Sequence, residues 1–586
     1  MQSLDELFKS ALRAASVCSP IARPIALSLL LLVISPSVLC AQEPRFGPLA
    51  GADAAVYHDA LAKERPTAPQ TLRVTGIAIP HHLLAADLIA RGMWAASGSS
   101  YDRILLLSPD HFRRSRRALA TTRRGFDTVL GQVEVDQSAT QHLIERKDLV
   151  DDSDLFSHEH GITGVLPFLR DVFPGVSVVP VVVGVGTDMH DWDAALDLLK
   201  QIVTPHTLIV QSTDYSHYLL PQLSRSRDQE TLNVIAVGDP TAVAGLHQSN
   251  HLDSKASQYL QMRLQHDVFH SHAAVIANRN SFEYVHENVP STSYVVTVYA
   301  ADAAGLSKLT YPDQQTIYFG GDVFLGRLFT VPLLDKAWTN RTVVDGLMRV
   351  TNGQPLVVNL EGVLTTHPPL NAPRDRHVMD DALAGPVLSA IHVRAAGLAN
   401  NHSFDLGPDG LAASARTLAA RGIEPLLHGK IADLGGFRLT NLNFVGLGDV
   451  KGYPVVRLGR RNGRASRQND VTHLCTSAAL PPLVALVHWG TEYTSSAPNH
   501  DREIAEKLAA CGVSLVIGAH SHQASPELTS ISGGQGLMLY SLGNLLFDQV
   551  SPRGSGTILE LRIFKQGTFA TRLITIANLY EAAAAR

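Results

Sequence analysis

The chain is poor in cysteine, with four in 586 residues. Cys18 and Cys40 lie near the N-terminus, so only Cys475 and Cys511 remain for the rest of the chain. Two cysteines cannot supply the three or four thiolates of a cysteine-based zinc site. An exported chain could pair them, but Cys511 ends a helical pattern and precedes an apolar run. That context favours an inert thiol in the core.

An excess of positive charge is also lacking. The chain has 49 basic and 54 acidic residues and a formal net charge of −5. Proteins that bind nucleic acid in general carry a basic surface, so we expect no nucleic-acid partner. A hydrophobic content of 45% and a charged content of 18% are typical of folded domains. The length predicts two or more of them.

Long hydrophobic runs are scarce. Residues 25–34 form an apolar run that follows Arg13 and Arg23 and is too short for a comfortable transmembrane helix. With the small residues after it, the run is typical of a secretory signal cleaved near Cys40 or Ala41, or of a retained membrane anchor. We therefore predict an exported protein of the periplasm or cell envelope, and association with the membrane through the N-terminus stays open.

Apolar strand patterns alternate with helical patterns along most of the chain, which predicts α/β domains with largely parallel sheets. Residues 300–313 contain several Ala, a Gly and a Pro and form the expected boundary between two domains. The predicted segments are a leader or anchor at 1–41, a linker at 42–70, a first domain at 71–300, a linker at 301–313, a second domain at 314–580 and a tail at 581–586.

Five short polar segments of the second half each follow a short apolar run. They begin at Gly320, Asn359, Asn400, His488 and His520. Side chains just past strand ends converge on one crevice of an open α/β sheet. Carboxylate, amide and imidazole groups gathered there suit divalent metals, and two such metals side by side promote displacement at phosphorus. One such segment alone is usually a turn or a surface histidine, but five in one half predict a shared site.

The residues and order of these motifs resemble those of the CapA (poly-γ-glutamate capsule biosynthesis) family, a branch of the calcineurin-like metallophosphoesterases with an α/β sandwich fold. The resemblance implies manganese, iron or zinc and a proton-donating or oxyanion-binding role for His402. The implied metal ligands are Asp322, Glu361, Asn401, His488, His520 and His522. The implied pocket residues are Asn359, Asn400, Asp405, Glu492 and Asn544. Two departures occur: Phe324 replaces a histidine ligand, and the bridging acid is Glu361 rather than Asp.

Histidines also follow predicted strands in the first half, at Pro80-His81, Asp110-His111 and Asp214 through His217, and Glu159-His160 opens a helix. Two histidines and a carboxylate with open positions suit a non-haem iron site. The alternative is that some of these residues form hydrogen bonds in loops at helix starts.

The order of these segments resembles the MEMO family (AmmeMemoRadiSam system protein B), a relative of the class III extradiol dioxygenase fold. The resemblance implies that His81 and His111 bind metal and that Asp214 and His217 line the pocket, with His217 as a base. A Cys-Gly that the family usually has near the next helix is absent here. We expect His270 or His272 to replace that thiolate, or the site to be altered. An imidazole there would favour iron or zinc over copper(I).

Six arginines follow His111: Arg113, Arg114, Arg116, Arg117, Arg123 and Arg124. Such a run is most often a solvated loop. The alternative is a basic rim that attracts an anionic ligand.

Three functions follow from these patterns. The first is a metal-dependent hydrolase in the second half, acting on a phosphoester or another anionic substrate. The second is a non-catalytic factor that binds an acidic polymer such as poly-γ-glutamate and assists capsule assembly or export. The third is an iron-dependent oxygenase or oxidoreductase in the first half. The expected partner is an anionic small molecule or acidic polymer, and the oligomeric state stays open.

Overall fold

The computed structural model describes residues 44–286, 290–445, 474–475, 481–549 and 556–576. Met1–Pro44 and Arg45–Arg586 are separate units. The predicted leader at 1–41 and the first two residues of the predicted linker therefore lie outside the described residues. A search of the described helices for one long and apolar enough to cross a membrane found none.

The first half contains one large mixed sheet. Its strands are β1 (Gly76–Ile79), β2 (Arg103–Pro109), β3 (Leu119–Thr121), β6 (Val150–Asp152), β7 (Ser177–Val183), β8 (Thr207–Ser212), β9 (His217–Leu219), β10 (His272–Asn280) and β11 (Ser291–Ala300). The order is β10-β11-β1-β8-β2-β7-β3-β6, and β9 pairs with β11. The central pairs β1–β8, β8–β2 and β2–β7 are parallel, whereas β10 and β11 run antiparallel. A separate hairpin joins β4 (Phe126–Thr128) to β5 (Gly131–Val133).

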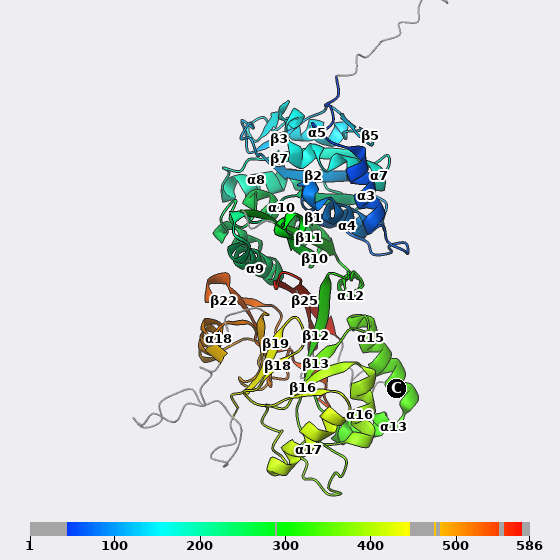
Figure 1. Cartoon of the computed structure of the whole chain (residues 1–586), viewed down its shortest axis with the longest axis vertical. Coiled ribbons are helices and arrows are strands. Elements are labelled where there is room, and N and C mark those ends of the chain that lie inside the picture. The colour runs from blue at the N-terminus through cyan, green and yellow to red at the C-terminus, as the bar shows by residue number, and fades with distance from the viewer. Residues whose placement is uncertain (1–43, 287–289, 446–473, 476–480, 550–555, 577–586) are drawn as a thin grey trace, which may run out of the picture. The chain divides into compact units, whose positions relative to one another are not determined.

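Helices cover both faces of this sheet (Figure 1). They are α3 (Ala54–Glu64), α4 (Ala86–Ala96), α5 (Gln137–Ile144), α6 (His160–Thr163), α7 (Leu166–Val172), α8 (Met189–Lys200), α9 (Pro221–Val237), α10 (Lys255–Leu264), α11 (Phe282–Val285) and α12 (Ala303–Leu306). Ile104 and Leu106 of β2 pack in the core with α3, α4 and α7, and Leu105 and Leu107 pack in the core with α8 and α10. Side chains alternate between the faces of a strand, so a strand that is apolar at every position is buried on both sides.

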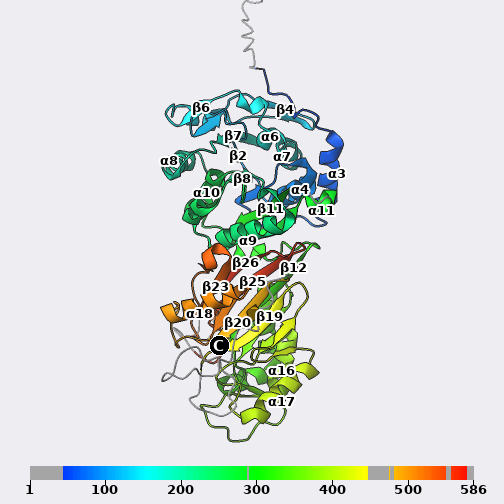
Figure 2. The ribbon, with the colours of Figure 1, turned by 60° about the vertical axis from the view of Figure 1, so that its left-hand side comes forward.

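The second half is a sandwich of two sheets (Figure 2). The first sheet contains β12 (Gln314–Val323), β13 (Leu356–Leu360), β16 (Val393–Gly397), β17 (Glu424–Leu426), β24 (Asn544–Leu546), β25 (Gly556–Phe564) and β26 (Phe569–Ile576). The second contains β18 (Ile431–Asp433), β19 (Arg438–Asn443), β20 (Leu483–His488), β21 (Val513–Ala519), β22 (Thr529–Ile531) and β23 (Gly536–Leu539). A shared apolar cluster that includes Phe319, Val357, Leu486 and Ile517 fills the space between them.

Outer helices and a small two-stranded sheet complete this half. They are α13 (Thr330–Leu334), α14 (Lys336–Trp338), α15 (Asp345–Thr351), α16 (Asp381–Ala390), α17 (Gly407–Ala420), α18 (Asn499–Ala510), β14 (Val363–Thr365) and β15 (Val378–Asp380). The pairs β12–β13, β13–β16, β19–β20 and β20–β21 are parallel. Their carboxyl ends therefore lie at common edges of the two sheets, as the sequence patterns predicted.

Two local predictions need correction. The helix predicted to open at Glu159-His160 ends at Thr163, and a second helix, α7, follows it, because Pro167 occupies the first turn of α7 and lacks the N–H that a continuous helix requires. Cys511 is not a free core thiol but forms a disulfide with Cys475. The two cysteines are 36 residues apart, and a sequence pattern cannot show that their Cα atoms come close enough to be bridged.

Candidate metal centres

The second half gathers the predicted ligands at strand ends of both sheets. Asp322 lies near the end of β12, Glu361 directly after β13, His488 at the end of β20 and His520 directly after β21. All four side chains are buried. Ligand atoms of Glu361, His488 and His520 lie within 4.8 Å of one another, as do those of Asp322, Glu361 and His522. The two groups share Glu361, which is the arrangement that a bridging carboxylate requires.

Asp322 organises one side of this centre. One carboxylate oxygen accepts a hydrogen bond from the Asn359 side chain at 2.7 Å, and the other accepts one from the backbone N–H of His520 at 3.1 Å. His522 Nδ1 lies 3.3 Å from the second oxygen, and its Nε2 lies 3.8 Å from Glu361 Oε1. The Asn544 side chain pairs with the same His522 Nδ1 at 2.9 Å. Three predicted residues therefore contact the Asp322 carboxylate, and His522 links it to Glu361 and Asn544.

Glu361 carries the strongest indication of a bound cation. Both of its carboxylate oxygens are buried and accept no hydrogen bond from the described residues. Burial and the neighbouring charges of Asp322 and Glu492 raise the pKa of Glu361 well above its usual value. A buried acceptor without a partner is costly, and divalent cations bind such oxygens. The residues present therefore fit one or two divalent ions.

The histidines of this centre also suit metal binding. His520 Nδ1 is buried and has no hydrogen-bond partner among the described residues. Burial lowers the pKa of His520 to about 4 and that of His488 well below its usual value, so both are neutral and suited to bind metal. Burial alone would lower the pKa of His522 as well, but the charges of Glu361 and Asp322 outweigh it and raise that pKa to about 9. His522 is thus the cation of the metal-free pocket.

Asn401 and His488 form the side of the second-half centre that lies opposite Asp322 and His522. His488 Nε2 lies 2.7 Å from Asn401 Oδ1, and its Nδ1 lies 3.3 Å from the Asn359 side-chain nitrogen. Because the amide nitrogen can only donate, His488 Nδ1 accepts and Nε2 carries the proton in this pairing. Asn400 donates to the backbone carbonyl of Leu360 at 2.9 Å, which holds the loop after β16 against the end of β13.

Backbone strain marks the segment after β21. His520 and His522 have φ values of 93° and 59°. Non-glycine residues rarely adopt this left-handed region, and such strain gathers at functional sites. The strain turns successive imidazoles toward Asp322 and Glu361.

His402 lies beside the centre with its own carboxylate partner. Its Nδ1 lies 2.9 Å from Asp405 Oδ2, which also accepts a backbone hydrogen bond from His377 at 2.6 Å. This contact leaves Nε2 as the functional atom of His402. Glu492 is exposed, so of the predicted pocket residues it lies at the rim.

Sequence reasoning missed His377. Its ring stacks on His402 at 3.6 Å and on Phe324 at 4.4 Å, and ligand atoms of His377, His402 and Glu361 lie within 4.8 Å of one another. Burial and the proximity of His402 lower the pKa of His377 to about 2. Phe324 stands where a histidine ligand was expected, so the missing histidine could have prompted a search for another imidazole.

The first half forms a second centre at the carboxyl ends of three adjacent strands. His81 follows β1, Asp214 follows β8 and His111 follows β2. The His81 and His111 rings lie 4.7 Å apart, and the His160 ring lies 4.1 Å from that of His111. The backbone N–H of His81 donates to Asp214 at 3.1 Å. The adjacency of these strands in the sheet explains why residues so far apart in sequence converge.

Glu159 orients His111. It accepts hydrogen bonds from His111 Nδ1 at 2.6 Å and from the backbone N–H groups of His111 and Gly161 at 3.1 and 3.0 Å. Glu159 is the N-cap residue of α6 and is almost fully buried. The predicted placement of Glu159 at a helix start is confirmed, and the hydrogen bond fixes which ring nitrogen of His111 faces the pocket.

Asp253 is the residue that sequence reasoning missed here. It lies directly before Ser254, the N-cap of α10. Its carboxylate lies 3.5 Å from His81 Nε2, 3.7 Å from His111 Nε2 and 3.3 Å from His217 Nε2. Burial would raise the pKa of Asp253, but the contacts with His111, His217 and His81 outweigh it and lower that pKa to about 2. A carboxylate just before a predicted helix was the available signal.

His270 and His272 do not reach this centre. His272 pairs with Ala300 at the start of β10, and the adjacent Ala273 and Tyr299 lie level with Gly76, the first residue of β1. The centre lies past the other end of β1. The expectation that one of these two histidines replaces a thiolate is therefore wrong, because the strand direction places them at the opposite edge of the sheet.

In the arginine segment after His111, some side chains form ion pairs and others are exposed to solvent. Arg116 pairs with Asp151 at 3.2 Å, and Arg123 with Asp152 at 3.5 Å. Arg113, Arg114 and Arg117 are exposed.

Replacing Arg113, Arg114, Arg116 and Arg117 together by Gln is expected to weaken binding of an anion at the first-half centre roughly threefold at low salt, because a local positive potential is removed. Phosphate titrations at about 20 and 200 mM salt, which differ in screening length, measure this effect. Arg146→Gln, an exposed change outside this arginine run, is the control. Equal affinities for the variant and the parent at both salt concentrations would contradict the basic-rim hypothesis.

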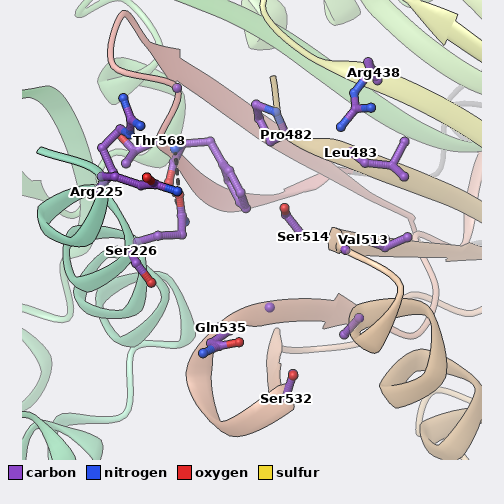
Figure 3. Close-up of a pocket in the computed structure, with 17 residues that line it drawn as sticks. Arg225, Ser226, Arg438, Pro482, Leu483, Val513, Ser514, Ser532, Gln535 and Thr568 are labelled. Atoms are coloured by element: carbon purple, nitrogen blue, oxygen red, sulfur yellow. Dashed lines mark hydrogen bonds between the residues drawn. The ribbon is translucent and has the colours of Figure 1, made fainter. Parts of the chain in front are cut away.

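Figure 3 shows the residues that line a cavity of about 660 Å³, none of which is a predicted ligand of either centre. Arg225 and Ser226 of α9 line one side, and Arg438, Leu483 and Val513 lie at the starts of β19, β20 and β21. Among the residues that the structure describes, its lining contains no Asp, Glu, His or Cys side chain. Since the metal ligands follow the ends of β20 and β21, this cavity belongs to the opposite edge of the sheet and has no ligands for a metal.

Comparisons with known proteins match each half of the chain to a different family. Residues 58–295 match the family described as Memo-like protein, and residues 316–430 and 460–549 match the family described as bacterial capsule synthesis protein PGA_cap. A MEMO1 family protein of Caldivirga maquilingensis is 26% identical over 142 residues, which is 22% of this chain and 48% of that protein. The PGA biosynthesis protein CapA of Bacillus subtilis is 24% identical over 225 residues, which is 36% of this chain and 57% of that protein.

A solved structure described as a phosphatase from Mycoplasma pneumoniae aligns with 47% of this chain and 97% of its own, at 13% identity and a TM-score of 0.28. A TM-score this low does not bear on function. The chain spans about half the length of the curated relatives it matches.

Proposed function

We propose that the second half of this chain, in which residues 316–430 and 460–549 match the bacterial capsule synthesis (PGA_cap) family after the Memo-like match at residues 58–295, is a metal-dependent hydrolase. Its substrate is a phosphoester or another anionic group at the cell surface. The observation that carries the proposal is Glu361, whose two buried oxygens accept no hydrogen bond from the described residues although six ligand-type side chains surround it.

In this proposal Asp322, Glu361, Asn401, His488, His520 and His522 hold one or two ions of manganese, iron or zinc. Such ions would polarise a phosphoryl oxygen and acidify a water toward neutral pH. Asp405 holds His402 through Nδ1 at 2.9 Å, so His402 Nε2 is the atom that gives a proton to the leaving oxygen or stabilises developing charge. Asn359 keeps Asp322 in place through the 2.7 Å hydrogen bond.

Hydrolysis of bis-p-nitrophenyl phosphate by the full chain with added Mn²⁺ tests the proposal. We expect metal-dependent turnover that falls about a hundredfold or more in Asp322→Ala and in His402→Ala, because one change removes a ligand and the other a general acid. His367→Ala changes an exposed histidine and is the control. Turnover that survives both changes would refute the assignment.

A second candidate is a non-catalytic factor that binds an acidic polymer. Phe324 in place of a histidine ligand favours it, since a centre with one ligand fewer can hold an ion without strong catalysis. Sedimentation of the protein with poly-γ-glutamate separates the two candidates. Binding that persists in Asp322→Ala, together with no hydrolysis by the parent protein, would support the polymer-binding factor.

The proposed location is the cell envelope, outside the cytoplasm. The Cys475–Cys511 disulfide supports this location, because disulfides persist in oxidising compartments. The apolar run at 25–34 is consistent with export or with a retained anchor.

A further inference from the structure

We propose that Asp253 is the third protein ligand of the first-half centre and that His81, His111 and Asp253 together bind iron(II) with positions left open for an exogenous ligand. The proposal is independent of the hydrolase assigned to the second half, because the two sets of ligands share no residue.

The spacing of the three donor atoms matches neighbouring ligands of one ion. Asp253 Oδ2 lies 3.5 Å from His81 Nε2 and 3.7 Å from His111 Nε2. Bonds of about 2.1 Å to a metal place adjacent ligand atoms roughly 3 to 3.5 Å apart. A small contraction of the pocket around an ion would bring the three atoms to bonding positions.

Hydrogen bonds fix the histidine tautomers that such a site requires. His111 Nδ1 donates to the Glu159 carboxylate at 2.6 Å, so Nε2 faces Asp253. Ser212 Oγ donates to the Gly161 carbonyl at 2.5 Å, so it accepts from His81 Nδ1 at 3.3 Å. Metal-binding histidines usually donate the other ring N–H in this way. Both Nε2 atoms therefore carry a lone pair for the ion.

Asp253 is held rigidly by its neighbour across the pocket. Its Oδ2 accepts the backbone N–H of Asp214 at 2.8 Å, and its own N–H donates to the Asp214 carbonyl at 3.1 Å. The side chain is 10% exposed. Two hydrogen bonds to the Asp214 backbone therefore fix Asp253 at the start of a helix, one of them through its carboxylate, which is already arranged for metal binding.

A further histidine, His217, lies next to Asp253. His217 Nε2 lies 3.3 Å from Asp253 Oδ1, and its Nδ1 donates to the Tyr215 carbonyl. His217 is therefore placed to exchange a proton with a molecule bound beside the ion. Two imidazoles and one carboxylate are the donor set of non-haem iron(II) sites, and the absence of a thiolate disfavours copper(I).

The test is iron binding by the full chain, prepared without oxygen with ferrous salt. Iron per chain and the S = 3/2 electron paramagnetic resonance signal of the nitric oxide adduct report the site and its open position. We expect a tenfold or greater loss of the signal in Asp253→Ala and in the near-isosteric Asp253→Asn. Asp197→Asn alters an exposed aspartate and should leave the signal unchanged. Every variant and the parent also carry Asp322→Ala, so that iron in the second-half centre does not contribute to the signal.

Circular dichroism of each variant separates loss of the ligand from loss of the fold, and Asp253→Asn retains an oxygen that can accept the Asp214 hydrogen bond. Asp253→Cys is expected to exchange iron(II) for copper(I). An undiminished nitric oxide signal in folded Asp253→Ala and Asp253→Asn, or no iron in the parent protein, would overturn the proposal.

Discussion

Replacing Glu361 by Gln is expected to abolish binding of a divalent cation in the second half and, at the same time, to stabilise the metal-free protein. Glu361 is buried, and its oxygens accept no hydrogen bond from the described residues. Asp322 and His522 are its charged neighbours, and its pKa is raised. A neutral amide of the same shape removes the unfavourable carboxylate, a gain of about 1 to 2 kcal/mol. The same change removes the shared ligand.

Thermal unfolding with EDTA and with Mn²⁺ measures both effects. The parent protein should gain about 2.7 kcal/mol at a metal concentration a hundred times its Kd, and Glu361→Gln should gain nothing. Without metal, the apparent Tm of the variant should exceed that of the parent by a few degrees. Glu503→Gln, an exposed change on α18, is the matched control. A variant that still responds to Mn²⁺ would contradict a bridging role for Glu361.

Metal affinity of the second-half centre is expected to rise with pH up to about pH 9. Glu361 and Asp322 raise the pKa of His522 to about 9 against the effect of burial. In the metal-free protein His522 is therefore protonated at pH 7, and the proton must leave before the ring can bind a metal. Below the raised pKa each proton released makes the affinity increase about tenfold per pH unit, and above it the dependence levels off.

Isothermal titration with Mn²⁺ at pH 6.5, 7.5 and 8.5 in buffers of different ionisation enthalpy gives the affinity and the number of protons released. His522→Gln should bind weakly and lose most of the slope, whereas His500→Gln, an exposed change, should keep it. An affinity that does not vary over this range would show that His522 is not displaced from its ion pairs by the metal.

Strand ends account for what could be predicted about the fold and the centres. Short apolar runs predicted the strands that the structure has as β1, β2, β7, β8, β20 and β21, because strands buried on both faces are largely apolar. Polar residues directly after such runs, such as His111 and His488, had to lie at one edge of a parallel sheet. The assignments of the two halves, which rested on these motifs, agree with the matched families.

Other features required the folded chain. Asp253 and His377 belong to no strand-end motif, and each enters its centre because a helix start or a small sheet brings it there. The direction of β10 places His270 and His272 at the opposite edge of the sheet from the first centre. Cys475 and Cys511 form a disulfide although they are 36 residues apart.

The linear order of apolar and polar residues was sufficient for the α/β class, the two halves and the residues on parallel strand ends, because these follow from local periodicity and from the common direction of adjacent strands. The identity of the third ligand, the tautomers of the histidines and the unpaired state of Glu361 depend on distances of a few ångströms between segments far apart in sequence. Packing of the whole chain sets those distances, and no local pattern carries them.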